Sequence, residues 1–147
     1  MLVLALKVVY AAMLNALNSG IHKLAEDSKI SAVDLRKLLL VETRTEKLQK
    51  VPDDFYFRIS LALRELRDRY EKERRAEILR EIEVLKSTAL DILRQRTRKI
   101  VKLAVLEPEP RKELTSLMSF EERALYRGLC ELLLSWENTI VKLLEGE

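Results

Sequence analysis

The chain has 147 residues, of which 48% are hydrophobic and 35% are charged, with only three glycines and three prolines. These values exclude a disordered chain and favour one domain of a few long helices, because few residues are available for turns. The net charge of +3 lacks the large excess of a dedicated nucleic-acid-binding protein. The single cysteine, Cys130, excludes an intramolecular disulfide and fits a reducing compartment.

Residues 1–17 are mostly apolar, but Lys7 and Asn15 interrupt them. A membrane-spanning helix needs about 18 or more apolar residues in a row, and a signal peptide needs a basic start, so neither is predicted. We expect instead a helix from near Leu2 to about Ala25. Because it is apolar almost all round at its start, the rest of the protein or a partner must cover it.

A second helix is predicted after the polar loop at residues 26–29. Ser31 and Asp34 resemble a capping box, in which each side chain bonds the other residue's backbone at a helix start. The inward-facing residues are predicted to be Val33, Leu35, Leu38 and Leu39. Residues 43–50 then form a polar connection.

The most distinctive stretch, L-Q-K-V-P-D-D-F-Y, runs from Leu48 to Tyr56. Pro52 suits the first position of a helix, where its missing N–H costs nothing. Asp53 then falls in the first turn, where negative charge meets the positive end of the helix dipole. Phe55 begins an apolar stripe at helical spacing, so we predict that it is buried. The predicted motif and core anchors are Leu48, Pro52, Asp53, Phe55 and Tyr56.

No glycine or proline occurs between Pro52 and Pro108, and one helix over this stretch would be on the order of 80 Å long. Because that is too long for a compact domain, we expect a break between Tyr70 and Ala76. The apolar stripe before the break comprises Phe55, Ile59, Leu63, Leu66 and Tyr70. The stripe after it comprises Ile78, Ile82, Leu85, Ala89, Leu93, Ile100 and Leu103.

The two prolines at 108 and 110 end this helix, because residues before proline avoid the helical region. Ser119 and Glu122 then form a full capping box for a final helix. Its apolar side carries Leu125, Leu129, Leu133, Trp136, Ile140 and Leu144. No alternation typical of strands appears. The predicted fold class is therefore all-α, with about five long helices packed as an elongated bundle and no β-sheet.

The sequence offers little for catalysis. His22, the only histidine, lacks the neighbours of a zinc site, and Cys130 lies on an apolar helix face with no base nearby in the sequence. No glycine-rich phosphate loop occurs, and the acidic pairs are explained by helix starts. We therefore predict a protein that is not an enzyme, with no catalytic residue, no metal ion and no cofactor.

The basic run from Arg94 to Lys102 has three interpretations: a solvated helix face, a structural ion pair with a subunit contact, or a phosphate-binding patch. Arg96 stands in line with the apolar stripe, where a guanidinium usually finds a carboxylate. We predict such a partner, in the same chain or in another subunit. The candidate interface residues are Arg94, Arg96, Arg98, Lys99 and Trp136.

Three segments, in order, resemble the GINS subunits, which are helical accessory proteins of the archaeal and eukaryotic replicative helicase. They are L-R-K-L-L followed by L-Q-K-V-P-D-D-F-Y, then I-L-R-Q-R-T-R-K-I-V, and L-M-S-F-E-E with the helix after it. The resemblance covers residues from about 31 to 144. It implies that residues 31–147 form the helical domain, whereas residues 1–30 form an apolar helix outside the family pattern. The small β-rich domain that usually follows is expected to be absent.

The resemblance further implies a non-catalytic scaffold subunit, cytoplasmic and associated with the nucleoid. Such subunits form tetramers with themselves or with a related GINS subunit. They bridge and activate the MCM helicase in DNA replication, together with a DHH-type nuclease-like partner. Assembly also follows from the apolar first and last helices, which carry more apolar surface than one small domain hides. The alternative is a helical nucleic-acid-binding adaptor that uses the face from Arg94 to Lys102, which leaves a weak DNA contact open.

Overall fold

The structure, a computed structural model, describes residues 3–4, 7–8, 10–11 and 29–147. Those described before residue 12 are helical, and the rest of the predicted first helix, with His22, lies outside the described residues. The described part of the chain contains helices and no strand, which confirms the all-α prediction. Its helices after residue 29 are α2 (Ala32–Arg44), α3 (Phe55–Glu73), α4 (Ala76–Leu106), α5 (Lys112–Thr115) and α6 (Phe120–Glu145).

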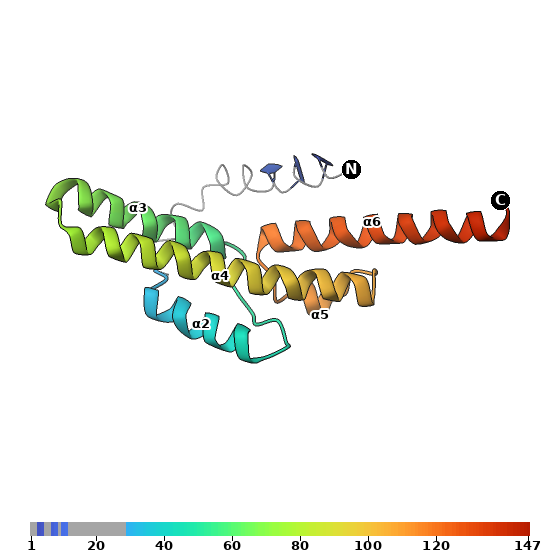
Figure 1. Cartoon of the computed structure of the whole chain (residues 1–147), viewed down its shortest axis with the longest axis horizontal. Coiled ribbons are helices and arrows are strands. Elements are labelled where there is room, and N and C mark those ends of the chain that lie inside the picture. The colour runs from blue at the N-terminus through green and yellow to red at the C-terminus, as the bar shows by residue number, and fades with distance from the viewer. Residues whose placement is uncertain (1–2, 5–6, 9, 12–28) are drawn as a thin grey trace.

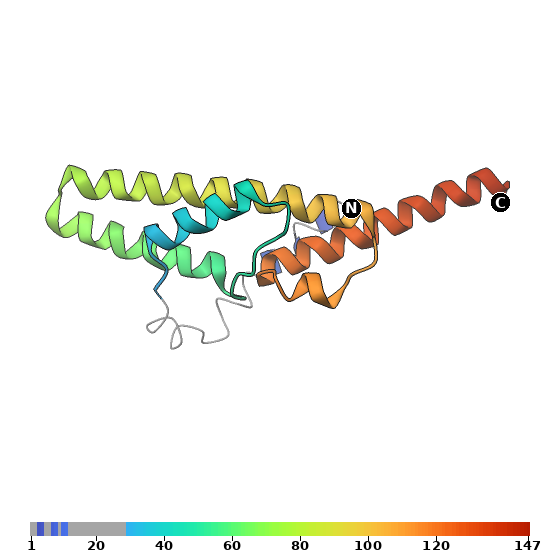
Figure 2. The ribbon, with the colours of Figure 1, turned by 90° about the horizontal axis from the view of Figure 1, so that it is seen from below.

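Helix α4 is the centre of the domain, because α2, α3 and α6 all pack against it. Figure 1 shows α3 and α4 side by side as an antiparallel pair, with α2 along the other side of α4. Helix α6 begins beside the second half of α4 and continues well past its end, which the view from below also shows (Figure 2). The bundle is therefore elongated, as predicted.

The break between α3 and α4 lies where the length argument placed it. Helix α3 ends at Glu73, and Arg74 adopts the left-handed conformation with φ of 51°. The Arg74 N–H donates to the Tyr70 carbonyl oxygen at 2.8 Å, which closes the last turn before α4 begins at Ala76. Glycine usually occupies such a left-handed position at a helix end, whereas here Arg74 adopts it.

Helix α2 begins with the predicted capping box between Ser31 and Asp34. The hydrogen bond from Ser31 lowers the pKa of the Asp34 carboxyl. Leu35 is fully buried, but Val33 is exposed, so the prediction that Val33 faces inward is wrong. Two residues along a helix correspond to a rotation of about 200°, which places Val33 on the side opposite Leu35.

Two apolar clusters form the core. The first lies between α2, α3 and α4 and comprises Leu35, Val51, Phe55, Ile59, Leu85 and Ile92. The second lies between α4, α6 and the segments that connect them, and comprises Leu48, Ile100, Ala104, Met118, Tyr126 and Cys130. Leu48 belongs to the second cluster and Val51 to the first, so the distinctive stretch joins both. Phe55 is buried, as predicted.

The buried face of α4 is shifted by one residue from the prediction around its middle. Leu93 is 41% exposed, whereas Ile92 is fully buried. Because neighbouring residues differ by about 100° around a helix, only one of the two can face the core. The corrected face runs through Ile78, Ile82, Leu85, Ile92, Arg96, Ile100 and Ala104. Arg96 is thus at its centre, four residues from an isoleucine on either side.

The prediction that Pro52 and Asp53 occupy the first turn of a helix is also wrong. Helix α3 begins only at Phe55. The Val51 N–H donates to the Leu117 carbonyl oxygen at 3.1 Å, and the Phe120 N–H donates to the Asp53 carbonyl oxygen at 2.9 Å. These two bonds hold Val51 and Asp53 beside the approach to α6, and a turn at Asp53 and Asp54 leads into the helix at Phe55.

Candidate functional site

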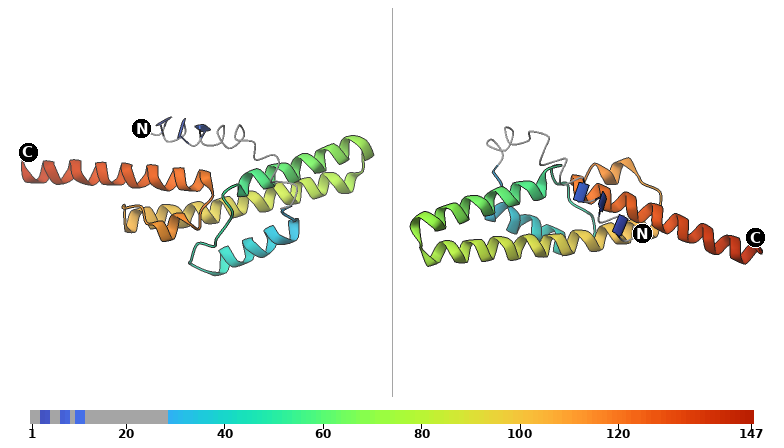
Figure 3. Two further views of the ribbon diagram at one scale, coloured as in Figure 1. Left: turned by 180° about the vertical axis from the view of Figure 1, so that it is seen from behind. Right: turned by 90° about the horizontal axis from the view of Figure 1, so that it is seen from above.

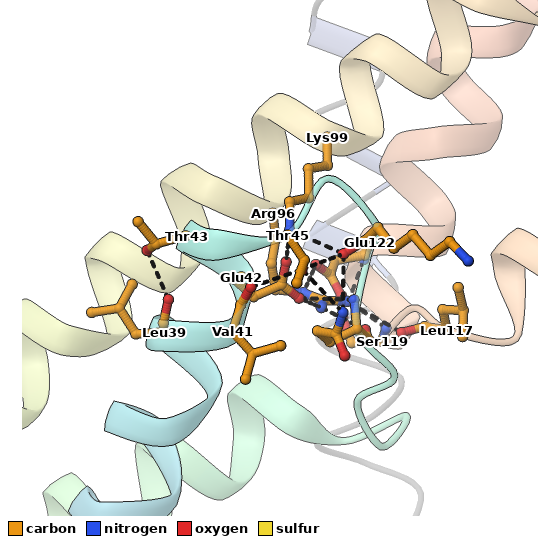
Figure 4. A network of polar contacts seen from close by, with 12 residues as sticks. Leu39, Val41, Glu42, Thr43, Thr45, Arg96, Lys99, Leu117, Ser119 and Glu122 are labelled. Carbon is orange, nitrogen blue, oxygen red and sulfur yellow. Dashed lines mark hydrogen bonds and ion pairs between the residues drawn. The ribbon is translucent and has the colours of Figure 1, made fainter.

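Arg96 is the centre of a buried network of polar contacts (Figure 4). Its Nε and Nη2 atoms donate to the two carboxylate oxygens of Glu122 at 2.7 and 2.9 Å. Its Nη1 donates to Glu42 Oε1 at 2.6 Å and to the Gln49 carbonyl oxygen at 2.7 Å. A further bond joins Nη2 to the Leu117 carbonyl oxygen at 3.2 Å. A guanidinium has five N–H groups, so each of them has an acceptor.

The charges of the network are balanced. Lys99 Nζ donates to Glu42 Oε2, which gives two cationic and two anionic side chains in one place. Burial alone would lower the pKa of the Arg96 guanidinium, but the hydrogen bond and charge of Glu122 and the charge of Glu42 outweigh it and raise the pKa. Arg96 is therefore charged at all physiological pH values.

Glu122 also starts α6. Its Oε1 atom accepts from the Ser119 N–H at 3.0 Å, and its own N–H donates to Ser119 Oγ at 3.3 Å. The capping box is therefore present as predicted, and the same carboxylate that completes it binds Arg96. The Tyr56 hydroxyl donates to Glu122 Oε2 at 3.4 Å. Burial and the charge of Glu122 raise the pKa of Tyr56 far above its ordinary value.

The network joins segments that are far apart in the sequence. Glu42 comes from the last turn of α2, Arg96 and Lys99 from α4, and Glu122 from the first turn of α6. The carbonyl groups of Gln49 and Leu117 add the two connecting segments. Because each hydrogen bond has a narrow range of distance and direction, the network fixes where α6 leaves α4.

The Asp53 side chain forms a separate ion pair next to this network. Arg123 Nη1 donates to Asp53 Oδ1 at 2.7 Å and to the Met118 carbonyl oxygen at 2.8 Å. The Arg123 guanidinium also lies over the Phe120 ring, 4.6 Å from its centre. Asp53 therefore helps to hold the start of α6 rather than the start of its own helix.

The basic run does not form one surface. Arg96 is fully buried in its own chain, so its prediction as an interface residue is wrong, although the predicted carboxylate partner is confirmed within the chain. Lys99 Nζ donates hydrogen bonds to the Glu42 carboxylate and to the Lys47 carbonyl oxygen, the latter at 3.1 Å. Arg94 is exposed and pairs with Asp91 at 3.2 Å, and Arg98 is exposed.

The remaining candidate, Trp136, is 64% exposed in the second half of α6, and the end of this helix continues past α4 (Figure 1). Figure 3 shows this part of the helix from two further sides, with no other described helix running along it. Leu143 and Leu144 on the next turns are exposed as well, so Leu144 does not reach the core. Leu125, Leu129 and Leu133, nearer the start of α6, pack against the second cluster as predicted.

Glu42 is the functional side chain that the sequence reasoning missed. It lies seven residues after Leu35, and the spacing of Leu35, Leu38, Leu39 and Glu42 is that of one helix face. A carboxylate in the last turn of an inward face is the signal that could have identified it. Glu122 was found, but only as part of a capping box.

The described residues contain no group of acidic, histidine or cysteine side chains that could hold a metal ion. In the same residues, no helix is both long and apolar enough to cross a membrane. Burial raises the pKa of the Cys130 thiol, which weakens it as a nucleophile. Fold and site therefore describe an all-α domain with an apolar core, one buried polar network around Arg96 and an exposed apolar helix end suited to protein contacts.

Comparison with known protein families identifies that domain. Residues 29–141 match the GINS complex protein helical bundle domain. The chain belongs to this family, which consists of non-catalytic scaffold domains of replication-associated GINS complexes. Searches of curated proteins and of solved structures found no significant match to the chain.

Proposed function

We propose that this protein is a non-catalytic scaffold subunit of a GINS-like complex that bridges and activates the replicative MCM helicase. It assembles as a tetramer, with itself or with a related GINS subunit, and contacts a DHH-type nuclease-like partner in the same complex. The observation that carries this proposal is the family match, which spans the helical domain from residue 29 to residue 141.

The exposed apolar end of α6 supports the assembly part of the proposal. Trp136, Leu143 and Leu144 are all more than half exposed and lie within nine residues of one another. A contiguous patch of large apolar side chains marks a protein contact more often than a single exposed residue does. Tryptophan is also enriched among the residues that dominate binding at interfaces.

The structure gives less support to direct DNA binding through the basic run. Arg96 and Lys99 are committed to carboxylates, and Arg94 has an acidic neighbour. Arg98 and Lys102 are the exposed basic side chains of the run that remain. Two such residues make too few phosphate contacts for tight binding, because affinity rises with the number of phosphates neutralised.

Reconstitution with purified proteins tests the proposal. The protein, alone and with a related GINS subunit, is mixed with the MCM ring and with the DHH-type partner from the same organism, and each mixture is separated by size with its mass measured. We expect a joint complex and faster duplex unwinding by the MCM ring. A protein that binds neither partner, leaves unwinding unchanged and instead binds DNA with a steep salt dependence would overturn the proposal in favour of the nucleic-acid adaptor.

A further inference from the structure

The end of α6 is both apolar and acidic. Residues 135–147 are exposed throughout, except for the half-buried Ile140. The exposed large apolar side chains of this segment are Trp136, Val141, Leu143 and Leu144. Its charged residues are three glutamates, at 137, 145 and 147, against the single Lys142. We call residues 135–147 the α6 end.

The outer face of α4 is apolar and basic. Val101 and Val105 are exposed on the side of α4 opposite the buried Ile100 and Ala104. Arg98 and Lys102 are exposed on the same side, since residues 98, 101, 102 and 105 share one helix face. Residues 94–106 contain no acidic side chain at all. We call the residues Arg98, Val101, Lys102, Val105 and the adjoining Leu106 the α4 outer face.

The two surfaces match in length as well as in charge. The helical part of the α6 end, residues 135–145, is about 16 Å long, and residues 94–106 of α4 span about 20 Å. One can therefore lie along the other with an apolar strip between them and opposite charges at the margins. Within one chain this is impossible, because α6 runs away past the end of α4 (Figures 1 and 2).

We infer that the α6 end of one copy of this protein docks on the α4 outer face of a second copy. The inference rests on the assembly proposed above and deepens it by naming the contact. Two copies can exchange their α6 ends, so that each contact occurs twice around a two-fold axis. Pairing of one α6 end with another is disfavoured, because it places like charges opposite each other.

Charge reversal tests this contact. In the first variant Glu137→Lys and Glu145→Lys make the α6 end basic, and in the second Arg98→Glu and Lys102→Glu make the α4 outer face acidic. Each variant alone places like charges together, and its self-dissociation constant should rise roughly tenfold or more in sedimentation equilibrium. The four changes combined restore opposite charges, so they should recover most of the lost affinity.

Matched controls separate this contact from general effects of charge. Lys86→Glu changes an exposed lysine elsewhere on α4, and Glu131→Lys changes an exposed glutamate on α6 before the α6 end. Both should self-associate as the wild type does. Circular dichroism of every variant should show unchanged helix content, because all the substituted residues are exposed.

The outcomes distinguish this contact from the wider proposal. A wild-type multimer that neither pair of changes weakens, or a quadruple variant without recovery, overturns the contact and leaves assembly intact. A wild-type monomer that forms a tetramer only with a related subunit also overturns it, while the scaffold function stands. A protein that binds neither a second copy of itself nor a related GINS subunit, the MCM ring or the DHH-type partner contradicts both this contact and the proposed function. If the Arg98 and Lys102 changes abolish binding to duplex DNA and leave self-association unchanged, the α4 outer face is a DNA surface instead.

Discussion

Two regions of the molecule reverse the usual distribution of charged residues at the surface and apolar residues in the interior. They are the buried network around Arg96 and the exposed α6 end. The first places two cations and two carboxylates where apolar side chains normally lie, and the second places a tryptophan and two leucines where charges normally lie. The difference is that the network is complete within the chain. Each N–H of the Arg96 guanidinium has an acceptor, whereas the α6 end has no neighbouring helix among the described residues.

This contrast assigns different tasks to the two regions. A buried ion pair adds little net stability over well-packed apolar residues, because desolvation offsets the attraction. Its effect is geometric, since it holds α2, α4 and the start of α6 in one arrangement. The direction of the α6 end depends on that arrangement, so the buried network around Arg96 orients the exposed α6 end.

Among the substitutions that test this difference between the two regions, Arg96→Ala should have the largest effect on the unfolding free energy. It leaves the Glu42 and Glu122 carboxylates buried without their main partner, which should cost about 3–5 kcal/mol of unfolding free energy. Urea denaturation followed by circular dichroism measures the change. Arg98→Ala, two residues away and exposed, is the control and should stay within about 0.5 kcal/mol of wild type. Equal midpoints for the two variants would contradict the role given to the network.

A similar loss of unfolding free energy is expected for Phe55→Ala, because this substitution removes apolar packing rather than an ion pair. Phe55 is 1% exposed in the first cluster, and truncating a buried phenylalanine leaves a cavity that costs about 3–5 kcal/mol. The same urea experiment measures it. Phe120→Ala is a matched control, because that ring is 41% exposed and its loss should cost clearly less. The burial of Phe55 would be in doubt if both variants unfolded together.

Much of this architecture could be predicted from the sequence. The features that were predicted correctly all depend on residues close together in the chain. The helix starts at Ser31 and Ser119 follow from side chains three residues apart, and the break near Arg74 follows from length alone. The start of α3 was misplaced because bonds to Leu117 and Phe120 decide it, and those residues lie more than sixty positions away. No local pattern carries that information.

The site divides in the same way. The position of Arg96 in an apolar stripe predicted a carboxylate partner, because an unpaired guanidinium is too costly to bury. That stripe could not say which carboxylate, because Glu42 is 54 residues away and Glu122 is 26 away. Trp136 was predicted as a candidate interface residue, but its spacing continues the apolar side of α6, so the sequence could not separate it from Leu125, Leu129 and Leu133, which pack against the second cluster.

A smaller effect is expected from alkaline pH. Burial raises the pKa of Tyr56, Tyr126 and Cys130 above their ordinary values of 10.0 and 9.0. Because their folded pKa values are raised, these groups contribute fully below about pH 9, and stability should be lost as the pH rises through 9 and 10. Thermal melts across this range measure the loss. Tyr56→Phe should reduce the slope, and a flat profile for the wild type would contradict the burial.

The smallest effect on the fold is expected from Trp136→Ala. The side chain is mostly exposed, so the unfolding free energy in a dilute sample should change by no more than about 0.5 kcal/mol. Its effect on assembly should be much larger, because tryptophans at the centre of interfaces often contribute about 2 kcal/mol or more to binding. A variant that unfolds readily on its own would place Trp136 in the core of the fold instead.

The central claim is that the chain completes its interior alone but needs a partner for the α6 end. The most direct test is the mass of the purified protein by light scattering, for wild type, Trp136→Ala and Lys86→Ala over a range of concentrations. We expect a multimer for wild type and for Lys86→Ala, whose substituted lysine is exposed outside the α4 outer face, and a smaller particle with unchanged helix content for Trp136→Ala. A wild-type protein that remains a monomer at every concentration, alone and with related GINS subunits, would contradict the claim.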